Sequence, residues 1–203
     1  MSRDMDIRRL DVDSFELREV DGEMTINGHA AVFDRLSEPI MGMFRERIVP
    51  GAFARSLQDA ARDVFALWQH DTSMPLARRS KGTLRISEDA KGLAVEIDLP
   101  DTSYGRDVAA NVRSGLVDKI SFGFSVPPGG DTMTKERDEN GLPIRELRDV
   151  DLFEVSPVTL PAYPDTSLSA RSREAAEAIA ADAGAGRLDI LRKRLDLSEQ
   201  LAR

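Results

Sequence analysis

Lys119-Ile-Ser-Phe-Gly-Phe-Ser-Val126 has the pattern of a β-strand with two unlike faces. Side chains alternate along a strand, so one face is bulky (Ile120, Phe122, Phe124, Val126) and the other small (Ser121, Gly123, Ser125). The bulky face requires a core. A strand glycine often marks the close approach of another backbone. Two interpretations follow: an ordinary sandwich strand with small residues outward, or a serine that cleaves an extended peptide.

The composition limits the class of protein. With 203 residues, the chain can form one domain with a real core plus an appendage, or two very small domains. A net charge of -8 argues against nucleic-acid binding, which depends on Lys and Arg neutralising phosphates. The absence of cysteine and the presence of only 2 histidines exclude disulfides, thiolate zinc sites and polyhistidine metal sites. We therefore expect no cofactor.

Targeting signals are also missing from the sequence. No apolar run approaches the length of a membrane span, and the N-terminus, Met1-Ser-Arg-Asp-Met-Asp, lacks the apolar core of a signal peptide. The sequence predicts a cytosolic protein that does not interact with membranes.

Strand signals dominate the first three quarters of the chain. Asp21-Gly22 is the preferred dipeptide of a tight hairpin turn, and a second hairpin is expected over residues 82–99. Shorter strands are predicted at 44–49, 64–68 and 150–155, the last closed by Pro157 and Pro161. Helices are predicted at 52–61 and from Thr102 or Ser103 to about Arg113, and an exposed hairpin within 127–149. The fold class expected is α+β and β-rich, with a mainly antiparallel, barrel-like core, a few surrounding helices and a C-terminal helical tail.

A change of composition near Asp165 divides the chain into a domain, 1–165, and a tail, 166–203. The tail is alanine-rich at 175–183, and Leu188, Leu191 and Leu195 then share a helical stripe. The stripe can be a helix packed on the domain or on its twin, or a tether to a partner. We expect a homo-oligomer.

Three polar residues stand out on separate predicted strands: Ser121, His70 and Glu154. His70 follows the apolar run 64–68, and the alternation places Glu154 on the same face as Val150 and Leu152, where a carboxylate needs a partner. A hydroxyl, an imidazole and a carboxylate are the components of a nucleophile, a base and a group that orients the base.

Each residue also has a plainer interpretation. A buried histidine can be a satisfied core group, and Glu154 can pair with an arginine. His29, between Gly28 and Ala30, is expected to be structural. Asp71 and Asp151 compete with Glu154 for the third role, although alternation puts Asp151 on the opposite face. Neither a Gly-x-Ser-x-Gly elbow nor a glycine-rich phosphate loop is present.

Several blocks, in order, resemble a known family: Ile48-Val-Pro-Gly-Ala-Phe53, Leu67-Trp-Gln-His-Asp71, Gly92-Leu93, Ile120-Ser-Phe-Gly-Phe124 and Glu154-Val-Ser-Pro-Val-Thr-Leu-Pro-Ala162. The combination is similar to the prohead maturation proteases of tailed bacteriophages, serine peptidases with a fold like that of the herpesvirus assemblins. The resemblance covers roughly residues 15–165.

The resemblance implies a serine endopeptidase with His70 and Ser121 as catalytic residues. The herpesvirus relatives use a second histidine, but His29 lies in no matching motif, so Glu154 is favoured as the third member. The substrates implied are scaffold or capsid-protein precursor segments inside the immature capsid, and the protease itself. Arg78 and Arg79 are weighed as oxyanion donors, but their motif does not align and a solvated basic turn is favoured.

Two further interpretations stay open at this stage. One is a non-enzymatic scaffold or assembly protein that keeps the protease fold without the activity. The other is an unrelated β-rich binding module. Only the protease needs Ser121 and His70 together, so these residues discriminate between the classes.

Overall fold

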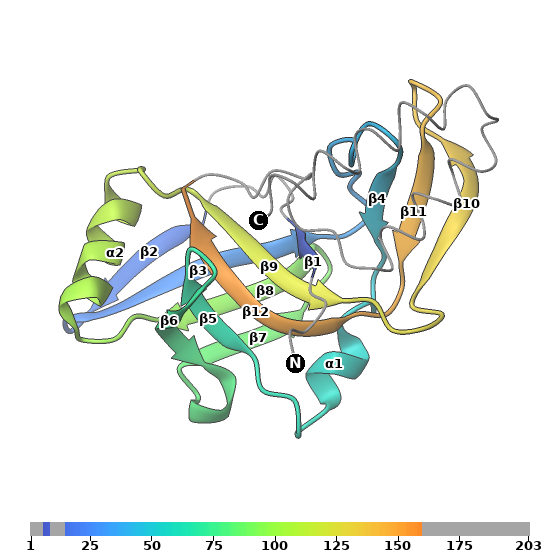
Figure 1. Cartoon of the computed structure of the whole chain (residues 1–203). Coiled ribbons are helices and arrows are strands. Elements are labelled where there is room, and N and C mark those ends of the chain that lie inside the picture. Colours follow the sequence, from blue (N-terminus) through green and yellow to red (C-terminus); the bar gives the residue numbers. More distant parts are fainter. Residues whose placement is uncertain (1–5, 9–14, 160–203) are drawn as a thin grey trace.

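A computed structural model describes residues 6–8 and 15–159, and the elements below belong to these ranges. Figure 1 shows mostly strands, with two α-helices at the periphery. The helices are α1 (Ala54–Gln58) and α2 (Ser103–Arg113), with a short 3-10 helix at Arg79–Lys81. The strands are β1 (Asp6–Arg8), β2 (Glu16–Val20), β3 (Glu23–Val32), β4 (Arg45–Ile48), β5 (Phe65–Trp68), β6 (Asp71–Arg78), β7 (Leu84–Glu88), β8 (Gly92–Asp98), β9 (Lys119–Ser125), β10 (Asp131–Arg137), β11 (Pro143–Leu147) and β12 (Asp151–Val158).

The strands form three sheets. A five-stranded sheet has the order β1-β9-β12-β5-β6, a four-stranded sheet the order β2-β3-β8-β7, and a three-stranded sheet the order β10-β11-β4. The β12–β5 and β11–β4 pairs are parallel, and the other described pairs are antiparallel. The β-rich, mainly antiparallel class is thus confirmed. The described strands do not close into a barrel, and the predicted helical tail lies outside the described residues.

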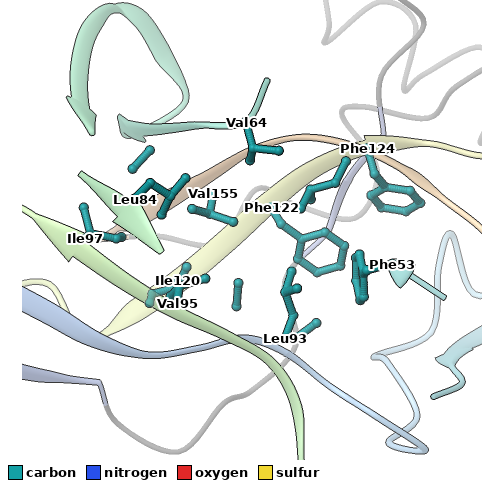
Figure 2. Packing of buried hydrophobic residues seen from close by; sticks show 14 of the residues in the cluster. Phe53, Val64, Leu84, Leu93, Val95, Ile97, Ile120, Phe122, Phe124 and Val155 are labelled. Atoms are coloured by element: carbon teal, nitrogen blue, oxygen red, sulfur yellow. The ribbon is translucent and has the colours of Figure 1, made fainter. Parts of the chain in front are cut away.

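The core lies between the five-stranded and the four-stranded sheets. Figure 2 shows Ile120 and Phe122 of β9 directed toward Leu93 and Val95 of β8. The rings of Phe53 and Phe122 meet edge to face with centroids 5.8 Å apart, a favourable aromatic geometry. The bulky face predicted for β9 therefore packs into this core, and Ile120, Phe122 and Phe124 are fully buried.

Local signals predicted several elements correctly. Asp21 and Gly22 join β2 to β3 with positive φ at both residues, as a tight primed turn requires. Thr102 caps α2, because its hydroxyl accepts a hydrogen bond from the backbone N–H of Gly105 at 3.1 Å. The hairpin of β7 and β8 is present as expected.

The first helix is shorter than the predicted range 52–61. α1 ends at Gln58, and the next residue, Asp59, has an extended backbone. Its carboxylate accepts a hydrogen bond from the backbone N–H of Ala61 at 3.0 Å. Aspartate side chains compete with the helix for backbone donors in this way, so the chain turns instead of continuing.

β6 was not predicted, and it begins directly after His70. The strand begins with three polar residues and contains Pro75, and both features argue against a strand in sequence. It is an edge strand that pairs only with β5 among the described strands, and an edge tolerates both features.

The region 127–149 forms the predicted hairpin, but its expected solvent exposure is wrong for β11. That strand is buried between β10 and β4, and Arg145 at its centre is 0% exposed. Its guanidinium binds Glu46 at 2.7 Å and Asp131 at 2.8 Å. Opposite charges on the two neighbouring strands permit the burial, and one of them, Glu46 of β4, lies outside the sequence of the hairpin.

Candidate active site

Ser121 and Ser156 face each other across the centre of the five-stranded sheet. β9 and β12 are antiparallel, and their register pairs Ser121 with Ser156 and Gly123 with Glu154. Directly paired residues of neighbouring strands share a face. The small face of β9 therefore meets Glu154 and Ser156 of β12, on the side of the sheet opposite the core.

A β-bulge brings Glu154 to this face. Leu152 pairs with Phe124 and Glu154 with the next residue of β9, Gly123, so Phe153 is the extra residue. The expectation that Glu154 lies on the same face as Leu152 is wrong for this reason. By the same register Asp151, paired with Ser125, belongs to the polar face and not to the opposite one.

The strand β12 also continues past its predicted end at Val155, and Pro157 does not close it. Pro157 pairs with Ile120, and the strand ends at Val158. The carbonyl of Pro157 accepts a hydrogen bond from the backbone N–H of Gln69 at 3.3 Å. The end of β12 thus holds the turn that carries His70.

His70 lies in a two-residue turn and not in the strand before it. Trp68 of β5 pairs with Asp71 of β6, and the intervening Gln69 and His70 have φ values of 54° and 64°. Residues other than glycine are strained in this left-handed region of backbone conformation, and such strain concentrates at functional sites. The side-chain amide of Gln69 donates to the Thr159 hydroxyl at 3.1 Å, and this bond holds the turn against the end of β12.

His70, Glu154 and Ser156 form a hydrogen-bonded network. Nδ1 of His70 lies 2.7 Å from Oε1 of Glu154, and the Ser156 hydroxyl donates to Oε2 at 2.5 Å. The same hydroxyl accepts from the backbone N–H of His70 at 3.3 Å. The Glu154 side chain is only 5% exposed. Its hydrogen-bond partners among the described residues are His70 and Ser156, and not the arginine of the alternative interpretation.

The contact with Glu154 determines which nitrogen of His70 can accept a proton. A carboxylate is an acceptor, so Nδ1 carries the hydrogen, and Nε2 of a neutral imidazole then has a free lone pair. Nε2 is buried and has no hydrogen-bond partner among the described residues. Ser121, with no exposed surface, lies one strand away, opposite the serine that contacts both His70 and Glu154.

The competing carboxylates are engaged elsewhere. Asp71 accepts hydrogen bonds from the backbone N–H and the hydroxyl of Ser73, which lower the pKa of its carboxyl. Asp151 forms ion pairs with Arg55 at 2.7 Å and with Arg62 at 3.2 Å. Neither is placed as Glu154 is.

The remaining sequence candidates lie outside the network. His29 is in β3 of the four-stranded sheet, with its Nε2 2.8 Å from the carboxylate of Asp89. Arg78 pairs with Asp63 and lies over the ring of Phe65, 4.7 Å from its centroid, and Arg79 donates to the carbonyl of Leu57. The two arginines thus have structural partners.

Sequence reasoning assigned no role to Ser156 or Gln69. Ser156 was within the Glu-Val-Ser block, two residues after Glu154, a spacing that puts both side chains on one face of a strand. That spacing was the sequence signal available for Ser156. The sequence held no such signal for Gln69, because its contact with Thr159 depends on tertiary structure.

The described residues form neither a membrane-spanning helix nor a metal-binding cluster. Within residues 6–8 and 15–159, no helix is long and apolar enough to cross a membrane. No group of three or more His, Cys, Asp or Glu side chains there could hold a metal ion.

A serine, a histidine bonded to a carboxylate, and a β-rich scaffold define the class of a candidate serine hydrolase. The chain belongs to the family of caudovirus prohead serine proteases, whose model matches residues 12–180. Its fold is similar to that of the capsid assembly protease of bacteriophage T4, gp21, with a TM-score of 0.50, 10% sequence identity, and coverage of 76% of this chain and 97% of that one. A search of curated protein sequences found no match.

Proposed function

We propose that the chain is a serine endopeptidase that cleaves scaffold or capsid-protein precursor segments, and itself, during maturation of a phage prohead. The observation that carries the proposal is the 2.7 Å contact between His70 and Glu154, which leaves the buried Nε2 of His70 to act as a base. Ser121 is paired with Ser156, the serine that contacts both residues. Membership of the prohead serine protease family supports both the reaction and the substrate class.

In this mechanism Nε2 of His70 takes the proton from the Ser121 hydroxyl as its oxygen attacks the scissile carbonyl. The imidazolium then gives that proton to the leaving amine, and an acyl-enzyme ester forms on Ser121. Water, activated by the same nitrogen, hydrolyses the ester. Glu154 holds the ring in one tautomer and stabilises the imidazolium.

The test is incubation of the purified protein with its cognate capsid precursor, followed by mass spectrometry of the products. A fluorophosphonate probe should add covalently to Ser121 and to no other residue. Ser125→Ala is the matched control, because Ser125 is on the same face of β9 but pairs with Asp151 at the far end of the site.

The outcomes separate the protease from the assembly protein. The protease requires cleavage and labelling that Ser121→Ala abolishes and Ser125→Ala preserves. An intact precursor and an unlabelled Ser121, in a protein that still incorporates into proheads, would favour the non-enzymatic scaffold.

A further inference from the structure

The hydroxyl of Ser156 is a buried polar group of the site that has no role in the proposed mechanism. Ser156 has no exposed surface, although it carries a group that water would solvate well. Its contacts account for this burial: it donates to Glu154 at 2.5 Å and accepts from the backbone N–H of His70 at 3.3 Å. One hydroxyl therefore connects the carboxylate to the turn that carries the imidazole.

These contacts restrain the carboxylate of Glu154. A glutamate side chain rotates freely about its last bond, and either oxygen can face the histidine. With Oε2 bound by Ser156, only Oε1 is directed to Nδ1 of His70. The backbone contact restrains the turn at the same time, so the donor and the acceptor of the His70–Glu154 bond are fixed by the same atom.

We propose that Ser156 is a positioning residue for the reaction, which acts through Glu154 and His70 and does not itself touch the substrate. The inference rests on the proposed protease function and deepens it. It also assigns different roles to two paired serines: Ser121 attacks the substrate, whereas Ser156 is held by the carboxylate. Loss of a hydrogen bond that orients a catalytic group typically lowers the reaction rate by about ten- to a hundredfold.

The experiment compares Ser156→Ala with Ser56→Ala in the full chain. Ser56 is a matched control, because it is also fully buried and its hydroxyl accepts a hydrogen bond from Leu152 of the same strand, β12, at 2.9 Å. Each variant removes one buried hydroxyl that is hydrogen-bonded to a residue of β12, but only Ser156 contacts the catalytic candidates. Thermal unfolding establishes that each variant is folded at the assay temperature.

The first readout is steady-state cleavage of a precursor peptide. Ser156→Ala should lower kcat by about ten- to a hundredfold with KM nearly unchanged, because orientation of the base affects the chemical step more than binding. Ser56→Ala should keep kcat near the wild-type value. Ser156→Ala should still react with a fluorophosphonate at Ser121, more slowly. Equal kcat values in Ser156→Ala and Ser56→Ala, or labelling at Ser156 instead of Ser121, would overturn the proposal.

The second readout does not need activity. The proton shared by His70 Nδ1 and Glu154 should give a far-downfield proton NMR signal, assigned by its loss in Glu154→Gln. It should shift or broaden in Ser156→Ala and stay unchanged in Ser56→Ala. An unchanged signal in Ser156→Ala would refute the positioning role even in a protein without protease activity. Cleavage by Ser121→Ala at the wild-type rate would instead refute the proposed function.

Discussion

Ser121 and Ser156 are paired residues on neighbouring antiparallel strands, and the Ser156 hydroxyl donates a hydrogen bond to Glu154. Paired residues of such strands have Cα atoms about 4.5–5.5 Å apart, so the two hydroxyls share one small region of the sheet. The nucleophile proposed at Ser121 is therefore next to a serine that contacts both Glu154 and the backbone of His70.

Ser121→Ala should abolish cleavage and leave the fold nearly intact, because one hydroxyl is lost from the face of β9 opposite the core. Loss of a nucleophile or its base costs on the order of 10⁶ in kcat in a well-studied hydrolase, and the losses do not add. His70→Ala should therefore match the Ser121→Ala/His70→Ala double variant in a precursor cleavage assay. Full activity in Ser121→Ala would end the protease interpretation.

Glu154→Gln should cause a large but incomplete loss of kcat, since the shape is kept while the charge that stabilises imidazolium is removed. Asp71→Asn and Asp151→Asn are controls, because their carboxylates bind Ser73 and the arginines 55 and 62. Comparison of kcat for the three variants checks the assignment. A greater loss in either aspartate variant would show that the wrong carboxylate has been named.

Asp63 should contribute to stability at neutral pH and lose that contribution in acid. Burial acts to raise the pKa of its carboxyl, but hydrogen bonds from Ser80 and Arg78 outweigh burial and lower that pKa to about 2. Because the folded pKa lies below the ordinary value of 3.8, the stabilisation is complete above about pH 4 and disappears as the pH falls toward 2.

Urea unfolding at several pH values measures this effect. Asp63→Asn should lower the free energy of unfolding by about 1 kcal/mol at pH 7 and by less at pH 3. Asp101→Asn is the control, because the Asp101 side chain is almost fully exposed in its pair with Arg106 and should contribute little. An equal loss at both pH values in Asp63→Asn would contradict the assignment.

A chain that ends near Ser169 should fold and still cleave an added substrate, because the described strands and all the catalytic candidates precede residue 160. It should fail to enter the prohead if Leu188, Leu191 and Leu195 form a docking surface. Circular dichroism, peptide cleavage and incorporation into proheads measure the three properties. An insoluble truncated protein would show that the tail belongs to the fold, consistent with a family match that reaches residue 180.

Self-processing is tested on the full chain. The segment 170–183, which includes the alanine-rich residues 175–183, is the expected cleavage region, since small residues suit a shallow substrate groove. Mass spectrometry should find cuts there in the wild type and none in Ser121→Ala. A wild-type segment that stays intact while precursor is cut would remove self-processing from the proposal.

Local sequence signals predicted what depends on neighbours along the chain. The Asp21-Gly22 turn and the Thr102 cap are satisfied within a few residues, and the alternation around Ser121 describes β9 correctly. The combination of Ser121, His70 and Glu154 came from chemistry and from family resemblance. Its catalytic roles remain a prediction, whereas the contact between His70 and Glu154 is present in the structure.

What depends on another strand could not be predicted. Alternation placed Glu154 in the core, and the extra residue Phe153 reverses that orientation because of the pairing with β9. The burial of Arg145 depends on Glu46, which is distant in sequence, and the strand β6 exists because an edge tolerates Pro75. In each case the deciding partner is brought close only by tertiary structure.

The position of β12 has a consequence for protein synthesis. β12 is the last described strand along the chain, yet it is inserted between β9 and β5, which are made earlier. A ribosome that has released His70 and Ser121 has still not released Glu154, nor the strand β12 that lies between β9 and β5. The five-stranded sheet and the proposed catalytic site can therefore be completed only after β12 has emerged, so we expect an incomplete nascent chain to have no proteolytic activity.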